Sequence, residues 1–271
     1  MIEINNLNYT YAGSKTAVFS DFSLTIGEGI ICGLLGKNGT GKSTLLKLIC
    51  GLLQPKKGNV TIDSTAVGER RGDTLAKLFY VPDEIVFPNL SMDSYVKILR
   101  PFYPNFSNEV LRDCMDEFEM EIPQKLTRLS LGEKKKVALS IAIAMGTDIV
   151  LLDEPTNGLD ISSKVQFRKI MAKAMNDKRT ILVSTHLVHD IEQMLDHVVI
   201  IGKSGLLVDK STNDLMNEFA CDIVPAESDT KDIIYQEPSV GGLAIIRHRK
   251  EGENETNISL ELLFNYANSK K

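Results

Sequence analysis

GKNGTGKS, residues 36–43, matches the spacing G-x-x-x-x-G-K-[ST] and lies between an apolar run at residues 30–35 and a helix-like segment at residues 44–53. This order of strand, glycine-rich loop and helix is typical of a phosphate-binding loop, because glycines let backbone amides approach phosphate oxygens without a Cβ clash. In such a loop Lys42 reaches the outer phosphates of a nucleotide and Ser43 ligates Mg²⁺. The stretch therefore predicts an α/β nucleotide-binding fold. The residues expected to contact the phosphates are Gly36, Lys37, Asn38, Gly39, Thr40, Gly41, Lys42, Ser43 and Thr44.

Two further apolar runs, at residues 149–152 and 180–184, resemble strands buried on both faces of a parallel sheet. The first ends in Asp153 and Glu154, and His186 follows the second. Asp153 is placed to hold a hydrated Mg²⁺, and Glu154 to orient and polarise an attacking water. The His186 imidazole can hydrogen-bond a γ-phosphate. Together with Lys42, Glu154 and His186 are therefore the candidate catalytic residues.

The composition favours a soluble, cytoplasmic protein with a substantial core. The chain has 271 residues, of which 43% are hydrophobic, and its four cysteines contain no C-x-x-C pair. Its sequence has no apolar run near the roughly 18 residues that cross a bilayer, and no basic segment leading into an apolar stretch at its start. A net charge of −5 gives no general attraction for nucleic acid or acidic lipid. We therefore expect no nucleic-acid partner, and membrane association only through a partner protein.

The remaining segments predict additions to this core. Residues 1–8 and 22–26 show partial period-2 alternation, which indicates an antiparallel edge sheet. Between Asp83 and Ser140 the pattern becomes helical, as at residues 92–99 and 109–118, and is interrupted by prolines. This predicts an inserted helical subdomain.

A small C-terminal accessory segment is expected at residues 216–271. Residues 233–235 and 243–247 flank two glycines and predict a hairpin, and residues 259–266 predict an apolar helix. This segment is interpreted as a structural appendage in preference to a regulatory or dimerisation piece.

Leu129, Ser130, Leu131, Gly132 and Glu133 lie between the phosphate loop and the acidic strand end and precede a helix-like run at residues 134–145. Free backbone amides at a helix start bind anions, so this pentapeptide predicts half of a phosphate site. The three lysines at 134–136 are most simply interpreted as a solvated helix start, with the alternative that one of them supports the geometry of this pentapeptide, and no chemistry is assigned to them.

Taken in order, these motifs resemble the nucleotide-binding subunit of an ATP-binding cassette (ABC) transporter over roughly residues 1–215. The matching motifs are Walker A (36–43), the signature (129–133), Walker B (149–153) with Glu154 after it, the D-loop (158–160) and the switch His186. Tyr11 matches the family's aromatic residue that stacks on adenine. The resemblance implies a P-loop NTPase core with a parallel central sheet, an antiparallel β subdomain and an inserted α-helical subdomain at about residues 84–140.

The resemblance also implies a mechanism. Two such domains bind ATP and Mg²⁺ between one Walker A and the opposite signature, so that Ser130 and Gly132 act on the partner's nucleotide. The pair is a homodimer or two different ABC ATPases. Closing and opening of the dimer drives an integral membrane permease, which holds the ATPase at the inner face of the cell membrane.

Two residues depart from the family pattern. Where the family has a Gln that touches Mg²⁺ and the attacking water, this chain has Asp83. Asp83 is either a tolerated substitution, which is the favoured interpretation, or an Mg²⁺ ligand whose negative charge alters hydrolysis or coupling. Glu133 replaces the common signature Gln and is interpreted as an exposed polar substitution.

Two other functional classes are weighed as alternatives. Soluble ABC ATPases that act on ribosomes or DNA generally have tandem cassettes or coiled-coil or zinc insertions, and the sequence shows neither. A P-loop kinase or GTPase acting alone does not explain the signature. An exporter is favoured over an importer because residues 260–264 resemble the ending of some exporter ATPases.

Overall fold

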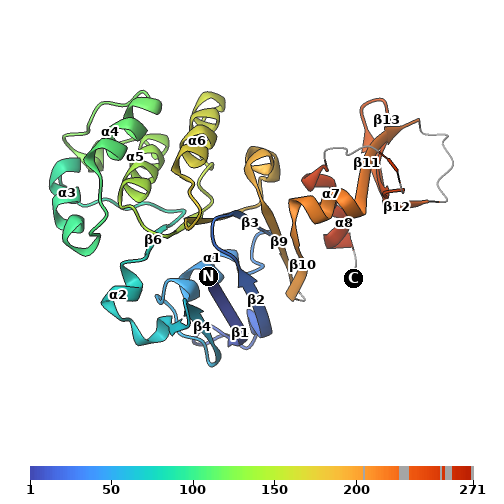
Figure 1. The fold of residues 1–271 in the computed structure, drawn as a ribbon, viewed down its shortest axis with the longest axis horizontal. Helices are drawn as coiled ribbons and strands as arrows, with labels where there is room; N and C mark the ends of the chain where they lie inside the picture. The colour runs from blue at the N-terminus through green and yellow to red at the C-terminus, as the bar shows by residue number, and fades with distance from the viewer. Residues whose placement is uncertain (204, 226–231, 251, 254–257, 270–271) are drawn as a thin grey trace.

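A six-stranded central sheet organises the structure, a computed structural model that describes residues 1–203, 205–225, 232–250, 252–253 and 258–269 (Figure 1). In spatial order its strands are β10 (Gly205–Ser211), β9 (His197–Gly202), β3 (Ile31–Leu35), β8 (Thr180–Thr185), β7 (Ile149–Asp153) and β6 (Leu78–Val81). The strands from β9 to β6 are parallel, and β10 pairs antiparallel with β9 at one edge. The prediction of a central parallel sheet is therefore confirmed.

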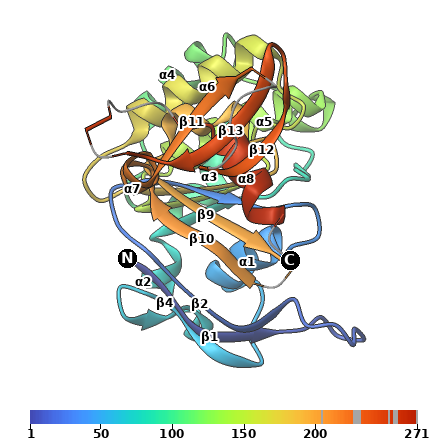
Figure 2. The same cartoon turned by 90° about the vertical axis from the view of Figure 1, so that its right-hand side faces the viewer.

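A second, antiparallel sheet lies below the first in Figure 1. Its strands, in spatial order, are β2 (Phe19–Ile26), β1 (Ile2–Tyr9), β4 (Lys57–Ile62) and β5 (Thr65–Ala66). The helix α1 (Lys42–Ile49) lies between the two sheets, and its buried leucines pack against both of them (Figure 2). The predicted antiparallel edge sheet is confirmed.

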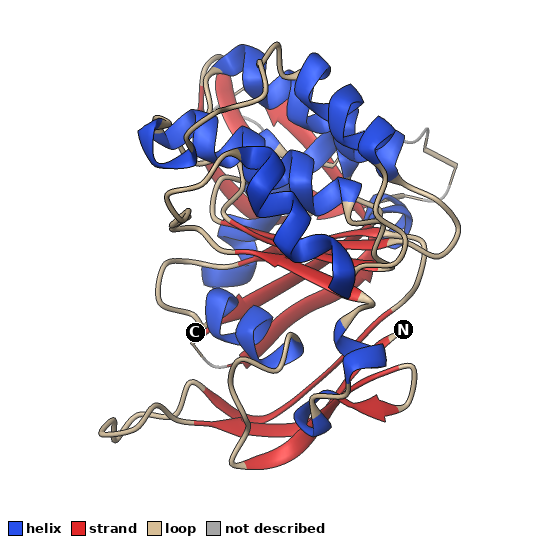
Figure 3. Ribbon diagram, turned by 90° about the vertical axis from the view of Figure 1, so that its left-hand side faces the viewer, coloured by secondary structure: helices blue, strands red, loops and turns tan. Residues whose placement is uncertain are grey.

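The helical part of the chain covers the other face of the central sheet, seen as the group of blue helices at the top of Figure 3. Its helices are α3 (Met92–Leu99), α4 (Asn108–Glu117), α5 (Leu131–Ala144) and α6 (Ile161–Ala174), and a short α2 (Gly72–Leu75) precedes β6. The N-cap side chains Ser91, Ser107, Ser130 and Asp160 each accept a backbone N–H in the first turn. These caps explain where the helices start, and the helices predicted at 92–99 and 109–118 are confirmed to within one residue.

Helix α5 begins three residues earlier than predicted. Gly132 therefore lies inside its first turn and does not precede the helix. The reason is the capping box between Ser130 and Glu133, which satisfies backbone groups at the helix start.

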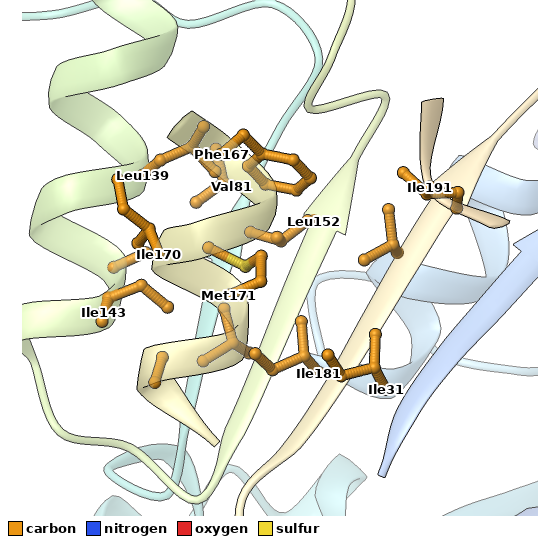
Figure 4. Close-up of a cluster of buried hydrophobic side chains, with 14 of the residues drawn as sticks. Ile31, Val81, Leu139, Ile143, Leu152, Phe167, Ile170, Met171, Ile181 and Ile191 are labelled. Atoms are coloured by element: carbon orange, nitrogen blue, oxygen red, sulfur yellow. The ribbon is translucent and has the colours of Figure 1, made fainter. Parts of the chain in front are cut away.

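The core beside the site is built from α5, α6 and the parallel strands (Figure 4). Leu139 and Ile143 of α5 meet Phe167 and Met171 of α6, and both helices point these side chains toward the strands. These four side chains are 3% exposed or less, and burial of each large apolar side chain contributes about 1.5–3 kcal/mol. This packing holds the strand ends, and the residues that follow them, in fixed positions.

The C-terminal segment forms a third sheet with a helix beside it. Its elements are α7 (Thr212–Glu218), β11 (Phe219–Val224), β12 (Ile233–Ser239), β13 (Gly242–His248) and α8 (Leu260–Ser269). The predicted hairpin (β12 and β13) and apolar helix (α8) are confirmed. The expected boundary after residue 215 falls inside α7, and α8 packs on β9, β10 and the short turn Val188–Asp190. This segment thus shares the core of the central sheet.

Within the described ranges, the longest helices have 14 residues, and no helix has the length and apolar character needed to span a membrane.

Candidate active site

A cavity of about 430 Å³ lies where β3, β7 and β8 end. The predicted site residues that line it are Tyr11, Asn38, Gly39, Gly41, Lys42, Ser43, Thr44, Asp83, Glu154 and His186. Val18 and Asn157 also line it, and neither was predicted. The strands are parallel, so their carboxyl ends meet at one edge of the sheet and bring these distant positions together.

The phosphate loop connects β3 to α1 and needs its glycines. Gly39 and Gly41 have φ values of 81° and 103°, which glycine adopts without strain. A Cβ atom at Gly36 would lie 2.4 Å from Thr40 Oγ1. Lys42 is buried, and its Nζ donates to the Gly36 carbonyl at 2.8 Å. The loop therefore holds the ammonium against its own backbone and facing the cavity.

Two oxygens fit a magnesium ion, one on Ser43 in the lining of the cavity and one on the buried Asp153 beside it. Ser43 Oγ donates to Asp153 Oδ1 at 3.0 Å, and Ser184 Oγ donates to the same oxygen at 2.5 Å. Mg²⁺ takes oxygen ligands and usually keeps several waters, so one hydroxyl and one carboxylate beside a triphosphate suit it. The described residues contain no group of three or more His, Cys, Asp or Glu side chains that could hold a metal by themselves.

Glu154 lies at the centre of a network of polar contacts. Its Oε1 is 2.9 Å from His186 Nδ1 and 3.4 Å from Lys42 Nζ, while Oε2 accepts from the Thr185 hydroxyl at 3.0 Å. Its backbone has a φ of 46°, an uncommon conformation for a residue other than glycine. Strained conformations of this kind persist where surrounding contacts fix them, and they cluster at functional sites. Glu154 thus contacts both of the other candidate catalytic residues, Lys42 and His186.

Tyr11 lies at the mouth of the cavity. Its side chain is 41% exposed, and its hydroxyl is 2.9 Å from Thr44 Oγ1. The ring meets Tyr9 edge-on, with 5.1 Å between centroids. These contacts fix the ring beside the phosphate loop and leave part of its surface open.

The expectation that residues 134–136 form a solvated lysine cluster is wrong for Lys135. Its side chain is 1% exposed, and its Nζ donates to Asp83 Oδ1 at 3.0 Å and to the Glu154 carbonyl at 2.8 Å. Asp83, 45% exposed, therefore carries its charge beside a buried ammonium. Its assignment as an Mg²⁺ ligand stays a prediction.

The signature residues Ser130 and Gly132 lie outside the cavity, at the start of α5. The Ser130 hydroxyl donates to Glu133 Oε2 at 2.7 Å and accepts from the Glu133 amide at 3.3 Å. The Ser130 hydroxyl and the Ser130 backbone amide both donate to the Glu133 carboxylate, and these two hydrogen bonds lower the pKa of Glu133 below its usual value. Glu133 thus caps the helix, a role that the family's Gln can also fill.

Two polar partners of the site, Tyr80 and Ser184, were missed by the sequence reasoning. The Tyr80 hydroxyl donates to Asp153 Oδ2 at 3.3 Å. Burial, together with the Asp153 carboxylate, raises the pKa of Tyr80 and keeps it protonated. Ser184 lies at the end of β8, and a hydroxyl at the end of an apolar strand was the available signal.

Comparison with known proteins agrees with this geometry. A family model described as ABC transporter matches residues 19–157. The chain is 32% identical over 219 residues to the ABC transporter ATP-binding protein YtrB of Bacillus subtilis (strain 168), covering 80% of this chain and 72% of that protein. It is 28% identical over 266 residues to the Nod factor export ATP-binding protein I of Cupriavidus pinatubonensis (strain JMP 134 / LMG 1197), covering 94% and 79%.

A solved structure has the same architecture. It is entitled "Dimeric Structure of MJ0796, a Bacterial ABC Transporter Cassette" and superposes with a TM-score of 0.67 at 25% identity, covering 78% of this chain and 98% of that one. The sheet order and the cavity at the strand ends had already indicated this fold, and the relatives share its sequence over most of their length. The chain therefore belongs to the ABC transporter family of ATP-binding proteins.

Proposed function

We propose that this chain hydrolyses ATP as one half of a head-to-tail pair of ATPases and thereby drives a separate membrane permease. The observation that carries the proposal is the division of the site. Glu154 contacts both Lys42 and His186 in one cavity, whereas Ser130 lies outside it. A second chain would have to bring its own Ser130 and Gly132 to this cavity to complete it.

The contacts of Glu154 suggest how the site is set for hydrolysis. In the structure the Glu154 carboxylate lies beside the Lys42 ammonium and within hydrogen-bonding distance of the His186 ring. A γ-phosphate carries more negative charge than one carboxylate and would compete for both groups. Glu154 would then be free to accept a proton from the attacking water. Ser43 and Asp153 would hold Mg²⁺, which neutralises charge that develops on the phosphates.

The helical part of the molecule offers apolar surface for a partner. Val86, in the loop after β6, is 89% exposed, and Phe102, after α3, is 67% exposed. Exposed apolar side chains near a polar rim are typical of protein interaction sites. We place the permease contact on this side, with the ATPase held at the inner face of the cell membrane. The export function named for the Cupriavidus relative supports export over import.

Purification of the tagged chain from detergent-solubilised membranes tests the proposed partner. We expect an integral membrane protein to remain bound through washing and to be identified by mass spectrometry. The test variant is Val86→Asp, which places a charge on the proposed contact and should reduce recovery of that membrane protein. Recovery with ribosomes or DNA in place of a membrane protein would refute the proposed function.

Replacement of Tyr11 by Ala is expected to weaken ATP binding about tenfold, because stacking of a base on an aromatic ring contributes about 1–3 kcal/mol. Fluorescence titration with a labelled ATP analogue measures the change. Tyr11→Phe is the matched control, since it keeps the ring and loses only the contact with Thr44. Equal affinity of the wild-type and Ala proteins would exclude Tyr11 from the adenine site.

A further inference from the structure

Lys135 connects three parts of the site. It lies in the second turn of α5, the helix whose N-cap is Ser130. Its ammonium reaches Asp83, in the loop after β6, and the carbonyl of Glu154, in the turn after β7. The signature helix, the Asp83 loop and the backbone of the catalytic Glu154 therefore meet at one nitrogen atom.

The burial of this ammonium requires such partners. A lysine side chain that is 1% exposed has lost nearly all contact with water, and a buried charge is tolerated when it is paired and hydrogen-bonded. The Asp83 carboxylate supplies the opposite charge, and the Glu154 carbonyl supplies a second acceptor. Loss of either side chain of the ion pair leaves the other charge without its partner.

The contact of Lys135 with the Glu154 carbonyl matters for the site because the backbone of Glu154 is strained. The residue has a φ of 46°, and its amide donates to the Ser184 carbonyl at 2.9 Å. The carbonyl accepts from Lys135 on the other side of the same residue. Fixing both peptide groups determines the direction in which the carboxylate projects into the cavity.

We propose that Lys135 is a positioning residue that ties the Asp83 loop to the backbone of Glu154, so that a movement of this loop moves the catalytic carboxylate. The proposal rests on the proposed function, since it assigns to Glu154 the activation of water. The ion pair also neutralises Asp83 locally, so the carboxylate at this position adds no net charge beside the γ-phosphate.

A double-mutant cycle on the whole chain tests the coupling between Asp83 and Lys135 without any need for hydrolysis. Asp83→Asn, Lys135→Gln and the double variant are compared with wild type by thermal unfolding. Each single variant is expected to lower Tm. The double variant is expected to lower Tm by less than the sum of the two single decreases, because two amides can hydrogen-bond without leaving a charge unpaired. Additive losses would show that the pair does not couple the two elements.

Hydrolysis by the same variants tests the positioning role. Each single variant is expected to lower kcat about tenfold with the Kd of a fluorescent ATP analogue within about twofold of wild type, and the double variant to recover most of the rate. Weaker ATP binding with unchanged kcat would overturn the proposal. Asp83 is 45% exposed, so Asp83→Asn leaves no cavity in the core and serves if Lys135→Gln does not fold.

Matched controls come from the neighbouring positions. Glu84→Gln removes one exposed charge from the same loop, and Lys134→Gln removes one partly exposed charge from the same helix. Both should leave Tm and kcat near wild type. If the wild-type chain had no ATPase activity, the proposed function would fail while the thermal cycle still reported the ion pair, so the two failures are distinguishable.

Discussion

Glu154→Gln is expected to lower ATP hydrolysis at least about 100-fold while ATP binding is retained, because proton transfer by a positioned carboxylate contributes about 10²–10⁴-fold. The amide has nearly the same shape as the carboxylate but cannot take a proton from water. It also removes negative charge next to Lys42, whose Nζ is 3.4 Å from Glu154 Oε1, and so favours a bound γ-phosphate. Phosphate release and binding of a fluorescent ATP analogue measure the two effects.

The same variant is expected to accumulate as a closed dimer in ATP, which size-exclusion chromatography with light scattering detects. Glu192→Gln is the matched control, since it makes the same chemical change on a carboxylate that contacts His189 at 3.1 Å, away from the cavity. Near-normal hydrolysis by Glu154→Gln in the presence of the permease would show that another group activates the water.

The fold and most of the cavity were predictable because they depend on local patterns. Apolar runs at 30–35, 149–152 and 180–184 indicated a parallel sheet, in which the polar residues after each run meet at the same edge. Strand direction therefore brings Glu154 and His186 to the same edge as the phosphate loop, which positions Lys42.

The ion pair at Lys135 was not predictable in this way. Three successive lysines after a helix cap are typical of a solvated turn, and the sequence does not show that the middle one faces inward. Its partner Asp83 lies 52 positions earlier, in a loop that is placed only when β6 joins β7. The packing of α8 on β9 and β10 depends in the same way on tertiary contacts.

Two inactive variants are expected to restore hydrolysis when mixed, because each site is shared between chains. Lys42→Ala removes the ammonium from the phosphate loop, and Ser130→Asp places a carboxylate where the partner's γ-phosphate would bind. Each variant alone should lose at least about 100-fold in rate. In an equal mixture half of the dimers are mixed, and one of the two sites in each mixed dimer is intact. The mixture should therefore reach about one quarter of the wild-type rate.

Aspartate is a good helix cap, so Ser130→Asp changes the charge while α5 can still begin at Leu131. Ser107→Asp, the same change at the cap of α4, should leave hydrolysis at the wild-type rate and shows that capping is not what is measured. Recovery in the mixture can arise only if Lys42 of one chain and Ser130 of the other act on the same ATP. A mixture no more active than its separate components would contradict the head-to-tail homodimer and point to a different ATPase chain as the natural partner.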